Sequence, residues 1–106
     1  MEVKVHTVKF EADANLLKFV QEKVEKLEVF YDNIIGSEVY LRMDNANNPE
    51  DKIAEIKIAV PGADLFAKKQ CKSFEEAIDT AVDALRRQVK KRKQKRNHKN
   101  RATFLL

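Results

Sequence analysis

The segment from Ser73 to about Arg96 constrains the fold most strongly, because a single helix there changes character half-way along its length. Ser73 and Glu76 form a capping box, in which the hydroxyl and the carboxylate satisfy unpaired backbone N–H groups at the start of a helix. Apolar side chains then recur at steps of three and four residues and define one face: Phe74, Ile78, Ala81, Val82, Leu85 and Val89. This half of the helix must pack on the rest of the chain.

The second half of the same helix carries cations in place of apolar side chains. Arg92 and Arg96 occupy the next positions of the apolar stripe, and lysines flank them. A core cannot accept a row of unpaired cations, because each would lose its hydration without compensation. We therefore expect the helix to leave its domain at about Val89, as part of a rod about 36 Å long with a cationic far end.

Charge is divided sharply between the two parts of the chain. Residues 1–85 contain 11 Lys or Arg and 17 Asp or Glu, whereas residues 86–106 contain 10 Lys or Arg and no acid. This division favours a polyanionic partner, because a concentrated positive field releases counterions from phosphates. The alternative is a solubilising tail that stays solvated, but so many cations in so short a segment repel one another. Nucleic acid is therefore the favoured partner.

The rest of the sequence predicts four strands and one further helix. Alternating apolar residues indicate strands at Glu2–Thr7, Glu38–Met43, Lys52–Val60 and near Asp64–Gln70. Asp13 is expected to cap a helix from Ala14 to about Tyr31, with this apolar stripe: Leu16, Leu17, Val20, Val24, Leu27 and Tyr31. The order β-α-β-β-β-α predicts an α+β fold, with a parallel first pair of strands and an antiparallel meander after it. Both helices should cover one face of this four-stranded mixed sheet.

Length and composition predict one domain, residues 1–96, followed by a flexible basic tail, residues 97–106. No apolar run reaches the roughly 18 residues of a membrane span, and the first residues carry no signal-peptide pattern. The single Cys71 excludes an intrachain disulfide. These features are typical of a protein of the reducing cytoplasm.

The residue types that carry catalysis are present without the partners they need. His6 and His98 have no Cys or carboxylate at metal-ligand spacing, and Cys71 has no partner base. Gly36 and Gly62 are single turn residues that form no phosphate-binding loop. Four acids lie near the start of the last helix, where the helix dipole favours them: Glu75, Glu76, Asp79 and Asp83. We expect no enzyme, no metal or cofactor and no small-molecule substrate.

The cationic residues are the remaining candidates for a functional site. Arg86 lies four residues before Lys90, so rows of cations run along the helix and can follow a phosphate backbone. Two lysines of the first helix would enlarge the patch if the helices lie side by side. The predicted RNA-binding residues are Lys23, Lys26, Arg86, Arg87, Lys90, Lys91, Arg92, Lys93, Lys95 and Arg96. Tyr40 and Phe66 are isolated aromatic residues of the open sheet face, so we expect recognition of RNA backbone and shape instead of base stacking on the sheet.

Five segments, taken in order, carry a resemblance to a known family. They are residues 26–34 (KLEVFYDNI), 38–41 (EVYL), 60–67 (VPGADLFA), 73–79 (SFEEAID) and 83–93 (DALRRQVKKRK). Together they resemble the ribosome hibernation-promoting factors, also called sigma-factor modulation or ribosome-associated inhibitor proteins. The resemblance covers about residues 3–96, and the last two segments are its most specific part.

The resemblance implies a fold akin to the double-stranded RNA-binding domain and binding to the small ribosomal subunit and its rRNA near the decoding centre. Such binding would occlude the mRNA channel and the tRNA sites and inhibit translation in stationary phase or stress. The family's basic contacts carry over to these positions, with Arg42 as a weaker candidate: Lys23, Lys26, Arg86, Arg87, Lys90, Lys91 and Lys93.

The resemblance also bears on assembly. The chain looks like the family's short form, which lacks the added dimerisation domain of longer members, and we expect a monomer off the ribosome. Whether it pairs ribosomes through a helper factor or inactivates single ribosomes stays open. The alternative functions are a protein-interaction module that binds an acidic partner, such as a transcription factor subunit, and a constitutive ribosomal protein.

Overall fold

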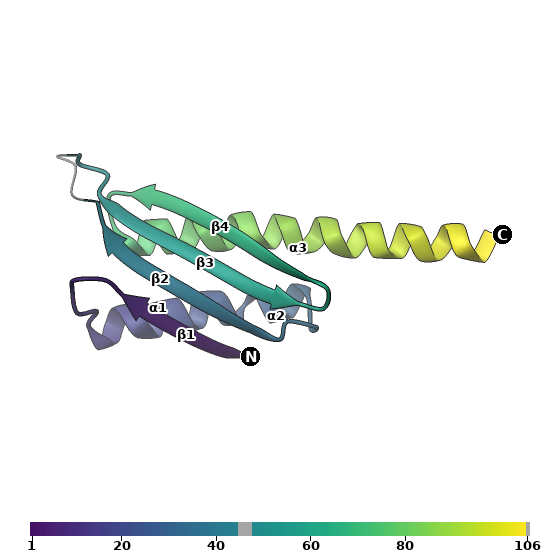
Figure 1. Ribbon diagram of the computed structural model, residues 1–106, viewed down its shortest axis with the longest axis horizontal. Helices are drawn as coiled ribbons and strands as arrows, with labels where there is room; N and C mark the ends of the chain where they lie inside the picture. The colour runs from purple at the N-terminus through teal and green to yellow at the C-terminus, as the bar shows by residue number, and fades with distance from the viewer. Residues whose placement is uncertain (45–47, 106) are drawn as a thin grey trace.

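The computed structural model describes the backbone of residues 1–44 and 48–105, and the side chains of these residues as far as Lys93. The elements in chain order are β1 (Glu2–Thr7), α1 (Ala14–Glu25), α2 (Leu27–Phe30), β2 (Gly36–Met43), β3 (Lys52–Val60), β4 (Ala63–Cys71) and α3 (Phe74–Leu105). The four strands form one sheet in the order β1-β2-β3-β4, and α3 projects beyond the ends of the strands (Figure 1).

The pairing of the strands confirms the predicted α+β topology. β1 is parallel to β2, and β2, β3 and β4 follow as an antiparallel meander. One register row crosses the whole inner face of the sheet and pairs Val5, Val39, Ile56 and Ala67 in turn. Because side chains alternate between faces along a strand, this row fixes which residues of every strand face the helices.

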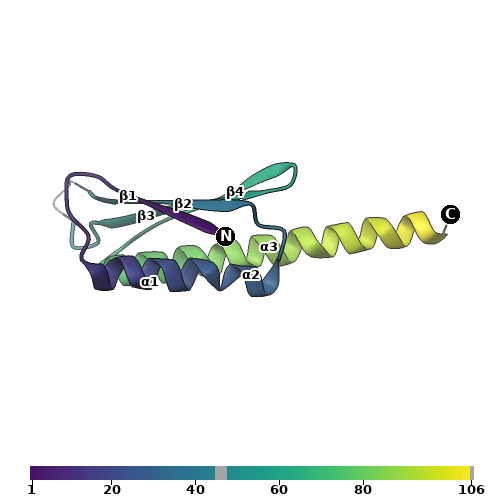
Figure 2. The ribbon, with the colours of Figure 1, turned by 90° about the horizontal axis from the view of Figure 1, so that it is seen from below.

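The core lies between the inner face of the sheet and the helices, which all lie on that one side (Figure 2). Val20 of α1, Ile56 of β3 and Leu85 of α3 are fully buried there. Each such aliphatic side chain contributes about 1.5–3 kcal/mol through the apolar surface that it removes from water. α1, α3 and the sheet therefore share one hydrophobic core, and α3 continues beyond it.

The first helix differs from the sequence prediction in two ways. It ends at Glu25, and the short helix α2 begins at Leu27, so the chain turns at Lys26 where a single helix to Tyr31 was expected. Val29 N–H donates to the Lys26 carbonyl at 3.1 Å, an i to i+3 bond that tightens the backbone at this point. Leu17, predicted to be buried, is 40% exposed, because it lies at the margin of the stripe that the other apolar residues of α1 form.

The last helix is longer than predicted. It continues to Leu105 instead of ending at about Arg96. No Pro or Gly interrupts the sequence after Gly62, and Lys, Arg, Gln and Ala are strong helix formers, so nothing in this segment stops the helix. The predicted basic tail is thus helical as far as Leu105, while its flexibility stays a prediction. Among the described residues, the helices are too short or too polar to cross a membrane.

Candidate nucleic-acid interface

Side-chain caps fix where the two long helices begin and therefore which residues they turn outward. Ser73 Oγ accepts a hydrogen bond from Glu76 N–H at 3.1 Å, and Asp13 Oδ1 accepts one from Leu16 N–H at 2.7 Å. Both are N-caps of the predicted kind, in which a side-chain oxygen satisfies a backbone donor of the first turn. With the start of α3 set, its apolar stripe faces the sheet and its cations follow in register.

The cations of α3 form two exposed rows. Arg86, Lys90 and Lys93 are separated by four and three residues and share the face toward α2, whereas Arg87 and Lys91 lie on the outer face. All five side chains are exposed. Arg87 Nη2 lies 3.4 Å from Asp83 Oδ2, an exposed ion pair that is worth at most about 1 kcal/mol and leaves the guanidinium available for exchange with a phosphate.

Lys23 of α1 and Lys26, which follows the end of α1, join this surface, as expected from the sequence for helices that lie side by side. Lys23 Nζ lies 3.3 Å from Asp79 Oδ1 on α3 and 5.5 Å from the centre of the Phe19 ring. Lys26 is exposed at the turn between α1 and α2. The structure thus brings Lys23, Lys26 and Arg86 together, although part of the charge of Lys23 is balanced by Asp79.

A groove of about 240 Å³ lies between α1–α2 and α3 at this point. Its lining includes the three cations Lys23, Lys26 and Arg86, and the two acids of α3, Asp79 and Asp83. Its apolar lining is Leu27, Phe30 and Val82. The guanidinium carbon of Arg86 lies 4.9 Å from the centre of the Phe30 ring, within the range of a cation–π interaction. Sequence reasoning did not propose Phe30 as a site residue, because its proximity to Arg86 depends on how α2 packs on α3.

Arg92 lies apart from the other cations of the predicted site. Its Nη2 donates to the Pro61 carbonyl at 2.7 Å, and its Nε is buried without a hydrogen-bond partner among the described residues. Gly62 has a φ of 81° and lies against the same guanidinium, since a Cβ there would stand 3.7 Å from Arg92 Nη2. One turn earlier, Gln88 Nε2 donates to the Phe66 carbonyl at 3.0 Å. The helix therefore leaves the domain after Arg92 and not at Val89, because the β3–β4 hairpin holds one further turn.

This contact predicts a structural role for Arg92. Arg92→Met keeps an unbranched apolar stem but removes the guanidinium and its hydrogen bond to Pro61, so we expect the free energy of unfolding to fall by about 1 kcal/mol. Urea denaturation measures the change, and Lys90→Met is the matched control, expected within about 0.5 kcal/mol of the unmodified chain because Lys90 is exposed. Equal effects of the two substitutions would contradict the role.

Two predicted site residues, Lys95 and Arg96, have side chains outside the described residues. The side chains of the predicted tail, residues 97–106, lie outside them as well. Arg42, the weaker candidate, is on the open sheet face, where its Nη2 lies 2.5 Å from Glu55 Oε1. Its contribution to RNA binding stays a prediction.

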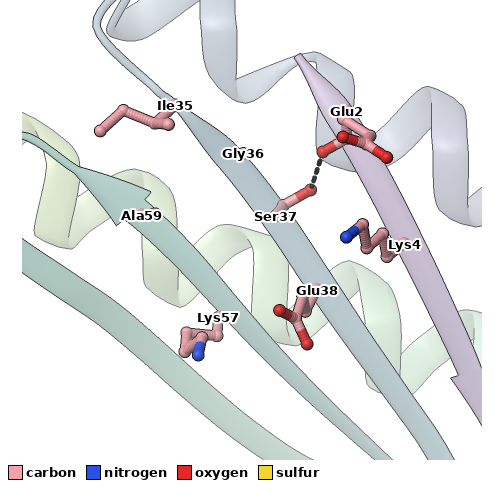
Figure 3. Close-up of a pocket in the computed structure, with 8 residues that line it drawn as sticks. All are labelled: Glu2, Lys4, Ile35, Gly36, Ser37, Glu38, Lys57 and Ala59. Atoms are coloured by element: carbon pink, nitrogen blue, oxygen red, sulfur yellow. Dashed lines mark hydrogen bonds between the residues drawn. The ribbon is translucent and has the colours of Figure 1, made fainter.

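The open face of the sheet is polar and nearly balanced in charge. Lys4, Glu38 and Lys57 occupy one register row across β1, β2 and β3, so each lysine lies beside the carboxylate (Figure 3). They line a shallow pocket of about 220 Å³, at whose edge Ser37 Oγ donates to the Glu2 carbonyl at 3.3 Å. Alternating charges of this kind give no net field for a polyanion, in contrast to α3.

Tyr40 was expected to be an isolated aromatic residue on this face, but the structure shows that it has an aromatic neighbour. Its ring stacks on His6 with centres 4.7 Å apart and planes 14° apart, and its hydroxyl donates to Glu38 Oε2 at 2.5 Å. That hydrogen bond, with smaller contributions from nearby cations, lowers the pKa of Glu38 below 4.5. The same bond raises the pKa of Tyr40 above its ordinary value of 10.0, since it favours the protonated phenol.

The Tyr40–Glu38 bond predicts a pH-dependent effect of Tyr40→Phe on stability. A lowered carboxyl pKa stabilises the fold above the ordinary value of 4.5, and this contribution is lost as the pH falls through the lower pKa of the folded state. The substitution should therefore destabilise the chain near neutral pH and have a smaller effect at acid pH. Thermal unfolding of both proteins across this range measures the difference, and a constant difference would refute the prediction.

The described residues show no metal centre. No group of three or more His, Cys, Asp or Glu side chains lies close enough within them to hold a metal ion. Cys71, a free thiol, lies 3.6 Å from the Thr80 hydroxyl. A hydroxyl of this kind does not act as the base that would activate a thiol.

Fold and site together define a small α+β protein with a cationic face on its last helix. A family model described as "Sigma 54 modulation protein / S30EA ribosomal protein" matches residues 3–97. The chain belongs to this family, which confirms the resemblance drawn from its sequence.

Relatives and solved structures agree with this assignment. The chain is 28% identical to a ribosome hibernation promotion factor of Bacillus subtilis over 93% of its own length, but it spans only 52% of that protein. It is also 28% identical to a ribosome hibernation promoting factor of Pseudomonas putida, with 90% of this chain and 89% of the relative covered.

Among solved structures, the N-terminal domain of Thermus thermophilus Protein Y matches with a TM-score of 0.75 and 26% identity over 86% of this chain and 98% of that one. A ribosomal subunit interface protein of Coxiella burnetii shares the fold, with a TM-score of 0.78 and 17% identity over 89% of this chain and 99% of that one.

Proposed function

We propose that this protein is a ribosome hibernation factor that binds the small ribosomal subunit through its rRNA near the decoding centre. Bound there, it occludes the mRNA and tRNA sites and inhibits translation in stationary phase or stress. Membership of the family and the names of its relatives support the ribosomal partner. The observation that carries the proposal is the exposed double row of cations on α3, since it offers repeated contacts to a phosphate backbone.

The proposed action is steric and requires no reaction. The domain supplies the bulk that fills the site, and the rows Arg86–Lys90–Lys93 and Arg87–Lys91 hold it there through charge. Because the helix is held by the β3–β4 hairpin as far as Arg92, the cations keep a fixed spacing of about 1.5 Å per residue along the axis. A rigid row loses little conformational entropy on binding, which favours a structured RNA over a flexible chain. This role places the protein in the cytoplasm.

Sedimentation of ribosomes tests this proposal. Purified small subunits should carry the protein through a gradient at low ionic strength and lose it as salt rises, with a slope of log K against log salt of about −0.7 to −0.9 for each neutralised phosphate. Ribosomes from stationary-phase cells should carry more of it than those from growing cells. Failure of the protein to bind small subunits at low salt would refute the proposal.

Nuclease treatment separates the proposal from its alternative. An association with the ribosome that depends on RNA is lost when the RNA is digested. A complex that survives digestion would favour an acidic protein as the partner of α3 instead. A constant stoichiometry in growing cells would favour a constitutive ribosomal protein.

A further inference from the structure

The groove between α1–α2 and α3 differs in chemistry from the rows of cations that surround it. Phe30 in its lining is 41% exposed, so part of an aromatic ring is accessible there, whereas Leu27 is buried. Asp79 and Asp83 add carboxylates from α3. Both carboxylates repel a phosphate and offset part of the charge of Lys23, Lys26 and Arg86 in the same lining, so the groove attracts the RNA backbone less than the outer rows do.

We propose that this groove holds one unpaired nucleotide of an RNA partner, an inference that rests on the proposed function. The base extends the stack that Phe30 and Arg86 begin, because flat bases stack on aromatic rings and on guanidinium planes. Lys26, exposed at the rim, binds the phosphate. The space of about 240 Å³ is below the roughly 300–1,000 Å³ of pockets that take drug-sized ligands, so it suits one base.

The carboxylates of the groove select among bases. An ionised carboxylate only accepts hydrogen bonds, so it favours a base edge that presents an amino group. Cytosine presents its exocyclic amine at the position where uracil presents a carbonyl oxygen. Asp79 and Asp83 each keep an ion pair, with Lys23 and Arg87 respectively, but a base carbonyl that faces either carboxylate would receive no hydrogen bond from it. The site therefore prefers cytosine to uracil.

Fluorescence anisotropy with short labelled oligo-C and oligo-U RNAs tests this preference on the full chain. The two RNAs have the same backbone charge, so the outer cations bind them equally and the ratio of the two affinities reports the groove. We expect oligo-C to bind about 5- to 10-fold more tightly, which is the lower end of the discrimination that one good base contact provides.

Two variants of the groove and one control complete the experiment. Phe30→Leu keeps the apolar volume and removes the stacking face, and Asp83→Asn replaces a carboxylate by an amide. Each should bring the affinity ratio close to one. Phe30→Leu should leave the salt slope unchanged, whereas Asp83→Asn also releases Arg87 from its ion pair and should change the slope equally for both RNAs. The control, Lys91→Gln on the outer face, should weaken both RNAs equally and reduce the magnitude of the slope by about 0.7, the loss of one contact to a single strand.

An affinity ratio of one in the unmodified chain, or a ratio that neither groove variant changes, would overturn the site. If Phe30→Leu fails to fold, the Asp83→Asn variant still tests whether the groove binds a base, because Asp83 is exposed. Failure of the proposed function gives a different pattern: a cytosine preference without any binding to small subunits refutes the ribosomal role and supports the groove. Binding to subunits without a cytosine preference overturns the groove alone.

Discussion

Reversing the charge of Arg87 and Lys91 together, as Arg87→Glu with Lys91→Glu, abolishes cosedimentation with small ribosomal subunits and leaves thermal stability close to that of the unmodified chain. The two residues form the outer row of α3, where both side chains are exposed. The double change removes two phosphate contacts and adds two repulsions. Because each contact contributes about one unit of salt slope, affinity at moderate salt should fall by about 100-fold or more.

Stability should change little, because the ion pair of Arg87 with Asp83 lies at the surface and is worth about 0–1 kcal/mol. A double reversal with the same change in net charge, Lys68→Glu with Lys72→Glu, serves as the matched control. Both of these lysines are exposed and lie outside α3. The control should retain binding to small subunits. Equal losses of binding in the two double variants would show that α3 contributes only through the net charge of the protein.

Leu85→Ala produces the largest expected loss of stability. Leu85 is fully buried between α3 and the sheet, so its truncation leaves a cavity and should lower the free energy of unfolding by about 2–5 kcal/mol. Domains of this size have a total stability of only about 5–15 kcal/mol. Urea denaturation monitored by circular dichroism measures the loss.

Leu17→Ala provides the same substitution at a site that is 40% exposed. It should cost less than about 1 kcal/mol, because little surface leaves or enters water at that position. A comparable loss in both variants would show that burial under the sheet does not govern the stability of α3.

Sequence patterns predicted the sheet well because they depend on local periodicity. The alternation of Val39 and Leu41 with polar neighbours indicates which face of β2 is buried, and a helical crossover between the first two strands requires a parallel pair. The caps at Asp13 and Ser73 depend on residues three positions apart, so they too can be recognised without a structure.

The site was predictable only in part, because its contacts join distant segments. The sequence identifies Arg92 as one cation among several, and only the fold shows that the carbonyl of Pro61 lies beside it. The same holds for Phe30 and Arg86, which come together through the turn at Lys26 that interrupts the first helix. Residues that act through neighbours far apart in sequence have no local pattern by which to recognise them.

The continuity of α3 from the core into the cationic segment has a consequence for how that segment acquires its shape. A separate peptide of the same sequence would have to nucleate its own helix, which is unfavourable, against repulsion between like charges four residues apart. In the intact protein the buried turns around Ile78 and Leu85 supply that nucleus, and the following turns only propagate it. The shape of the cationic segment is therefore inherited from the hydrophobic core, and a chain that loses its core also loses the spacing of its charges.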